Sequence, residues 1–145
     1  MLIDRLLNSP TRRALELSAS FAEQRQRVLA ENMANIDSPL FQDQTLDVRD
    51  FESGLRSALH EARRGGNGEL KLRDAAQSST DESGRLVVKP TRVSPGDAAD
   101  ASSRPARVEE LLTAAQQNAM RYGLASNLLK SRFDSLLTAV RGRTS

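Results

Sequence analysis

The sequence predicts an all-α fold in which two long helices, one near each end of the chain, pair as an antiparallel coiled-coil-like hairpin. Two observations favour this fold: apolar residues follow a helical period over residues 10–36 and a heptad period over residues 107–140. A short third helix is predicted between them, with an insertion that is flexible or forms a small β structure. The predicted divisions of the chain are residues 1–39, 40–64, 65–105 and 106–145.

The first long helix is predicted to begin at Pro10. Ser9 can accept hydrogen bonds from the free amides of the first turn, and proline is tolerated at the first helical position. The helix is predicted to end near Asp37, because Pro39 disfavours the helical conformation at Ser38. Its apolar face comprises Leu15, Ala19, Ala22, Val28, Leu29, Met33 and Ile36.

The middle of the chain carries weaker signals. A short helix is predicted to begin at the capping residue Asp47 and to end at Gly65, which is expected to adopt the left-handed conformation. Residues 65–105 are rich in glycine, proline and serine and poor in large aliphatic residues. The segments ELKL at 69–72 and RLVV at 85–88 are candidates for a small hairpin. So little apolar surface nevertheless favours disorder or a loosely held segment.

The strongest pattern lies in the last third of the chain. Apolar residues recur there at alternating steps of four and three over more than four heptads, which is typical of a coiled-coil contact face. We call this set the predicted seam, and it comprises Val108, Leu112, Ala115, Ala119, Tyr122, Ser126, Leu129, Phe133, Leu136 and Val140. Gly123 within this helix costs about 1 kcal/mol relative to alanine, which indicates a close contact or a local bend.

Composition excludes several classes of function. Only 38% of the 145 residues are apolar and 3% are aromatic, so we expect a core that is completed by assembly with other subunits. The single histidine, His60, has no second group to orient it, and there is no cysteine; we therefore expect no enzyme, no metal site and no cofactor. Basic residues near the C-terminus lack the interleaved aromatic residues that nucleic-acid binding favours. No apolar run is long enough to span a membrane.

Two asparagines near the end of the first helix need an explanation. Asn32 and Asn35 lie on nearly one face of a helix that is otherwise suited to packing. A buried amide at a helix interface fixes the register of packing, because leaving it unpaired is costly. We interpret the two residues as register-setting groups between subunits. The alternative is that they only cap the helix end locally.

The segment RQRVLAENMANIDSPLF, residues 25–41, resembles the N-terminal signature of flagellar rod, hook and filament-axis proteins. That signature is an LAxNIANxxTPGY-like stretch that closes the first helix. The C-terminal segment 118–140 also resembles the ending of a proximal-rod component of this family, with matching positions at Asn118, Tyr122, Leu129, Phe133, Leu136, Ala139 and Val140. The chain differs from the family at Leu40 and Phe41, where Gly-Tyr is usual. It also has Arg104 to Arg107 where the family tends to show Asn-x-Val-Asp.

The resemblance implies a structural subunit of the flagellar proximal rod. Such subunits are exported by the flagellar type III apparatus without a cleaved signal, and they form a helical assembly in the periplasm with other rod proteins and basal-body or export-gate components. Neither nucleic acid nor a membrane span is implied. The alternative function is a soluble coiled-coil adaptor or export chaperone in the cytoplasm.

The predicted contacts with neighbouring subunits follow from the two amphipathic helices. They comprise Leu15, Ala22, Val28, Leu29, Asn32, Met33, Asn35, Ile36, Leu112, Ala119, Tyr122, Leu129, Phe133, Leu136 and Val140. The predicted helix-terminating motif comprises Asp37, Ser38 and Pro39. The mechanism that we expect is assembly, with both long helices docking onto neighbouring subunits.

Overall fold

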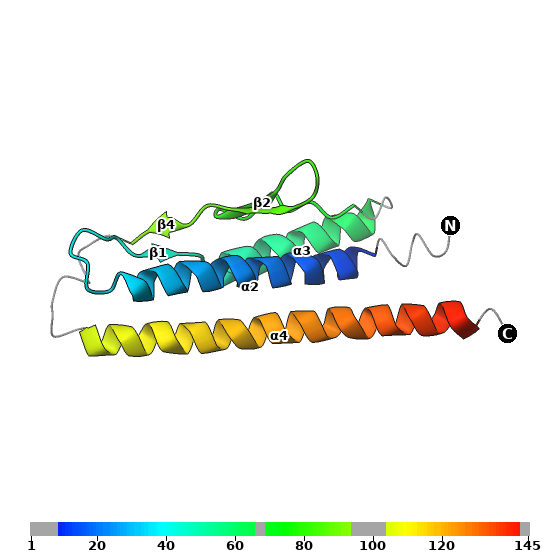
Figure 1. Cartoon of the computed structure of the whole chain (residues 1–145). Helices are drawn as coiled ribbons and strands as arrows, with labels where there is room; N and C mark the ends of the chain where they lie inside the picture. Colours follow the sequence, from blue (N-terminus) through cyan, green and yellow to red (C-terminus); the bar gives the residue numbers. More distant parts are fainter. Residues whose placement is uncertain (1–8, 66–68, 94–103, 143–145) are drawn as a thin grey trace.

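The computed structural model describes residues 9–65, 69–93 and 104–142. These residues form helices α2 (Pro10–Ala34), α3 (Val48–Arg64) and α4 (Arg104–Gly142) and the short strands β1 (Gln44–Thr45), β2 (Ser78–Thr80), β3 (Leu86–Val88) and β4 (Thr91–Arg92). Figure 1 shows that α2 lies between α4 on one side and a layer of α3 and the strands on the other.

The prediction of an all-α fold is wrong, because the described chain is a mixed α/β structure. Strand β1 pairs antiparallel with β4, and β2 pairs antiparallel with β3. The segment RLVV does enter a hairpin, but its partner is Ser78–Thr80 and not ELKL. Within ELKL, Leu72 instead donates its amide to the side chain of Thr80, at 3.1 Å, and lies in the core.

The expectation of disorder over residues 65–105 is therefore wrong for residues 69–93. Leu70 and Leu72 are both buried, and together they supply apolar surface that the sparse composition concealed. Their burial contributes roughly 1.5–3 kcal/mol each, which helps to offset the entropy of ordering the segment. Residues 66–68 and 94–103 of the predicted insertion lie outside the described residues.

Helix α2 begins as predicted, since Ser9 accepts a hydrogen bond from the amide of Arg12 at 3.3 Å and Pro10 opens the helix. It ends at Ala34, slightly before the predicted end. Asn35 stops it there by leaving the helical conformation, while its side chain donates to the carbonyl of Glu31 at 2.8 Å. The helix therefore ends because of a local cap several residues before the proline.

Helix α3 begins at the predicted cap, because the carboxylate of Asp47 accepts hydrogen bonds from the amides of Arg49 and Asp50. The expected left-handed conformation at Gly65 is wrong. Gly65 has a φ of −75°, in the right-handed helical region, and its amide simply continues the helical pattern to Glu61. Gly65 itself therefore does not provide the left-handed reversal that commonly ends a helix.

The core lies between α2, α3 and the strands. Its centre is a stacked pair of rings from Phe21 on α2 and Phe51 on α3, with centroids 4.1 Å apart and an interplanar angle of 7°. Around this pair lie Ala14, Leu17, Val28, Leu46, Leu55, Ala58, Ala62, Leu70 and Leu72. No residue of α4 belongs to this core among the described residues. The two long helices are therefore not equivalent: α2 is central, and α4 is added to its other side.

Gln77 is buried, and its side chain joins strands β1 and β4 to the start of α3. Its side-chain oxygen accepts from the amide of Asp47 at 2.6 Å, and its side-chain nitrogen donates to the carbonyl of Thr45 at 3.1 Å and to the hydroxyl of Thr91 at 2.6 Å. Each bond satisfies a polar group that the packing of the strands would otherwise leave without a partner. The hydrogen bonds of Gln77 therefore supplement the few backbone hydrogen bonds that such short strands can form with each other.

Replacing glycine by alanine is expected to have opposite effects on stability at two positions of the chain. A Cβ atom at Gly54 would lie 2.8 Å from the Cβ of Ala75 and 3.1 Å from its backbone nitrogen, whereas one at Gly123 would meet nothing within 4 Å. We expect Gly54→Ala to lower the free energy of unfolding by about 1 kcal/mol or more, because overpacking outweighs the gain in helix propensity. Gly123→Ala should raise it by up to about 1 kcal/mol. Urea unfolding followed by circular dichroism measures both.

A destabilised Gly123→Ala variant would contradict this pair of predictions. The open space around Gly123 also corrects the expectation of a close contact at that residue, since the structure places no atom there.

Candidate assembly interface

Helix α4 lies antiparallel along α2 (Figure 1), and the contact uses only one side of the predicted seam. The buried residues of α4 are Leu111, Asn118 and Ala125, which we call the inner row. They precede Leu112, Ala119 and Ser126 of the predicted seam by one position each. The helix is therefore rotated by about 100° relative to a contact through those three residues. Val108, Ala115 and Leu129 of the predicted seam remain partly buried beside the inner row.

The inner row has only three buried residues among those described, and the central one is polar. Asn118 is only 1% exposed, and its amide nitrogen donates to the carbonyl of Ala22 at 2.7 Å and to the side chain of Gln26 at 2.9 Å. Its side-chain oxygen has no hydrogen-bond partner among the described residues. A buried acceptor left in this state costs about 1–3 kcal/mol. The buried amide therefore fixes the register of α4 on α2, while few apolar side chains are buried in this contact.

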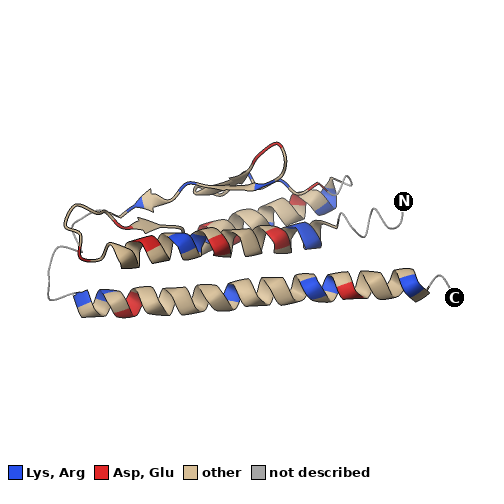
Figure 2. Ribbon diagram, in the orientation of Figure 1, with Lys and Arg blue, Asp and Glu red and all other residues tan. Residues whose placement is uncertain are grey.

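Three ion pairs link the first half of α4 to the rest of the chain. Arg104 pairs with Asp37 at 3.1 Å, Arg107 pairs with Asp43, and Arg121 pairs with Glu52 of α3. The Arg104–Asp37 and Arg121–Glu52 pairs are exposed and contribute little, about 0–1 kcal/mol each, whereas the side chains of Arg107 and Asp43 are only 22% and 18% exposed. Figure 2 shows long stretches of α4 without charge on either side of Arg121. The exposed ion pairs therefore help to position α4 but add little to the stability of its contact with the rest of the chain.

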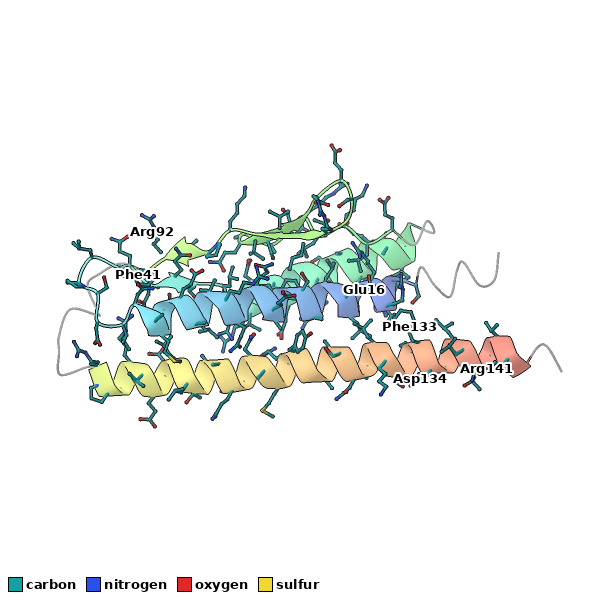
Figure 3. All side chains as sticks on the ribbon, in the orientation of Figure 1. Glu16, Phe41, Arg92, Phe133, Asp134 and Arg141 are labelled. Carbon is teal, nitrogen blue, oxygen red and sulfur yellow. The ribbon has the colours of Figure 1, made fainter. Side chains whose placement is uncertain are left out.

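One side of the predicted seam is left open. Residues Leu112, Ala119, Ser126, Phe133 and Val140 recur every seven positions, and we call them the outer column. All of them are exposed except Ser126, which is half-buried. Figure 3 shows Phe133 near the start of α2, where the guanidinium of Arg12 lies 5.9 Å from its ring centroid. The outer column is otherwise free to pack against another helix, since side chains seven positions apart share one face.

Asn32, interpreted from the sequence as a register-setting group between subunits, makes its hydrogen bonds within one chain. It is 4% exposed, and its amide forms two hydrogen bonds with the backbone of Gln44: its nitrogen donates to the carbonyl at 2.7 Å and its oxygen accepts from the amide at 3.0 Å. This pairing resembles that of a neighbouring strand. Asn32 therefore sets the register of β1 on α2, within one chain.

Asn35 follows the local alternative. Its side chain caps the carbonyl of Glu31, and its own carbonyl accepts from the amide of Ser38 at 2.9 Å. The predicted helix-terminating motif Asp37–Ser38–Pro39 continues this turn, with Ser38 accepting from the amide of Phe41 at 3.2 Å. The turn forms without the family's usual Gly-Tyr, and it needs no positive φ, because the described chain has one only at Gly84.

The structure divides the predicted interface residues into three groups. Ala22, Val28, Leu29 and Asn32 are buried inside the chain, and Leu15, Met33, Asn35, Ile36, Leu129 and Leu136 are half-buried. The exposed group comprises Leu112, Ala119, Tyr122, Phe133 and Val140, all on α4. The surface that remains available for a neighbouring subunit is therefore concentrated on α4.

Charged side chains gather in an open groove of about 880 Å³ between α2, the start of α3 and α4. Most of them already have structural roles: Asp47 caps α3, Asp50 accepts from the amides of Ala76 and Gln77, and Glu52 pairs with Arg121. Burial, followed by the nearby charge of Arg121, lowers the pKa of Arg25, while Asp47 raises it. An arginine remains charged at neutral pH after such a shift.

His60 is exposed, and no group of His, Cys, Asp and Glu in the described part of the chain could hold a metal ion. None of the described helices is long and apolar enough to cross a membrane. Comparison with protein-family models and with curated proteins gives no match to this chain.

Asn32→Leu should lower the free energy of unfolding by about 2–4 kcal/mol, because it leaves the amide and carbonyl of Gln44 without partners. Asn35→Ala is the matched control; it removes one partly exposed hydrogen bond and should cost about 1 kcal/mol or less. Urea unfolding of both variants measures the difference. Equal losses would show that the Asn32–Gln44 pairing contributes no more than an ordinary cap.

Proposed function

We propose that this chain is a structural subunit of the bacterial flagellar proximal rod, similar to the basal-body rod protein FlgB. The observation that carries the proposal is the outer column of α4, a heptad-spaced and largely apolar set of side chains that the described residues leave mostly exposed. A face of this length is suited to packing against a helix of a neighbouring subunit. The resemblance of residues 25–41 to the rod, hook and filament-axis signature supports the same conclusion.

The shape of the subunit fits this role. Helix α4 has 39 residues and a length of about 58 Å, well beyond the 25 residues of α2 beside it. Such a helix can contact α2 along part of its length and neighbouring subunits elsewhere. In this proposal the subunit is exported by the type III apparatus and joins a helical assembly with other rod proteins in the periplasm.

The runner-up is a soluble coiled-coil adaptor or export chaperone in the cytoplasm, which would use the same outer column for a different partner. Electron microscopy of isolated basal bodies from a strain with a tagged copy separates the two. Label at the membrane-proximal end of the rod is the expected result. Functional tagged protein that is absent from intact basal bodies would favour the adaptor.

A double substitution in the outer column tests the surface itself. Leu112→Ser with Val140→Ser should leave the folded subunit intact, because both side chains are exposed, and should reduce motility and rod assembly strongly. The matched control is Asn127→Ser with Lys130→Ser, two exposed polar residues on the same helix. Swimming on soft agar and basal-body yield are the measurements. Normal motility of the Leu112/Val140 variant would contradict assembly through the outer column.

A further inference from the structure

The packed core is complete without α4. The buried core residues and the partly buried residues packed against them all come from α2, α3, the strands and the segments that join these elements. Both strand pairs also lie before residue 93. We call this part of the chain, residues 9–65 and 69–93, the body. Helix α4 can therefore move away from the body without breaking a strand pair or opening the core.

The surface that α4 covers on α2 is small. Ala22 and Leu29 are buried on α2 but do not belong to the core cluster. They are seven positions apart and share one face of the helix, and the carbonyl of Ala22 accepts a hydrogen bond from Asn118 of α4. From α4, the described structure buries Leu111 and Ala125 besides Asn118. Alanine lets two helices approach closely, but it removes little apolar area from water.

Asn118 makes the docked position of α4 less stable than an apolar residue would. A side-chain amide has two N–H donors and an oxygen that accepts. In the docked helix the nitrogen donates to Ala22 and Gln26, whereas the buried oxygen has no partner in the described part of the chain. Water would satisfy the whole amide once α4 moved away, and the carbonyl of Ala22 would keep its hydrogen bond within α2.

The remaining contacts of α4 do not compensate for this. A hollow of about 190 Å³ lies between α2, α3 and α4, and its wall includes the stacked rings of Phe21 and Phe51. Side chains that face an empty space lose contacts on that side. Two of the three ion pairs of α4 are exposed, and the least exposed one, between Arg107 and Asp43, lies in the first turn of the helix. The rest of α4 depends mainly on the inner row.

We infer that α4 is a releasable helix: it opens as a unit while the body stays folded, and Asn118 sets how often it opens. Opening exposes Leu111 and Ala125 in addition to the outer column, and it uncovers the face of α2 that carries Ala22 and Leu29. The docked helix thus keeps part of the chain's apolar surface out of contact with other molecules. This inference concerns the chain by itself and does not rest on the proposed function.

Native-state hydrogen exchange of the full chain, followed by NMR, tests whether α4 opens separately. The backbone amides from Leu111 to Ala125 should share one opening constant. That constant should be at least about 10-fold larger than the opening constant of the amides of Phe21 and Leu55 in the core. Equal opening constants in α4 and in the body would overturn the inference, because the chain would then unfold as one unit.

Asn118→Leu tests the role of the amide. Leucine removes the unpaired oxygen and adds apolar area, and it has room because Asn118 borders the hollow. The opening constant of α4 should fall about 10-fold or more. The matched control is Asn127→Leu at an exposed position of the same helix, where the gain in helix propensity alone should change the constant by less than about 3-fold. An unchanged or larger constant in Asn118→Leu would overturn Asn118 as the residue that sets opening.

A double substitution that undocks α4 tests whether the body folds alone. Leu111→Asp with Ala125→Asp should reduce the protection of the α4 amides about 100-fold or more, because both charges would have to be buried in the docked helix. The amide of Phe51 should still exchange at least about 10-fold more slowly than those of α4. Leu112→Asp with Ala119→Asp is the matched control, since both positions are exposed and α4 should stay docked.

Unfolding of the body in the Leu111/Ala125 variant would refute a separable α4. Full protection of α4 in the same variant would show that the inner row does not hold the helix, and it would also overturn the inference.

Discussion

Helix α2 must bury two faces at once, and the arrangement of the other elements depends on this constraint. One face carries Phe21, which stacks on Phe51 and brings α3 and the strands into a core. The other face receives α4 through Ala22 and its neighbours. The chain has few aromatic residues with which to build a core. The same helix, α2, therefore makes both contacts, and neither contact alone would cover both of its faces.

The two faces of α2 differ in how much apolar surface they bury. The face toward α3 is apolar and closely packed, whereas the face toward α4 has a polar residue, Asn118, at its centre. Helix α4 consequently keeps much of its apolar surface outside the fold. A chain built in this way combines a packed core on one face of α2 with exposed apolar side chains on α4.

The sequence identified the helices well because their signals are local. Ser9, Pro10 and Asp47 act within one turn of themselves, and the structure places them as expected. The strands were not predictable in the same way, since β1 and β4 are held by Gln77 and Asn32, which lie far from them in sequence. The rotation of α4 about its axis was also not predictable from the sequence, because Leu111 and Leu112 are equally apolar. Only the position of α2 decides which of them is buried.

The pairing of Asn32 with Gln44 has a further consequence for the edge of the small sheet that contains β1. Strand β1 is bonded to β4 on one side only, and the free side of a strand is a template on which another chain can add a strand of its own. The amide of Asn32 occupies the hydrogen-bonding groups of Gln44 on that side. This side of β1 is therefore not open to pairing with a strand of another chain at Gln44.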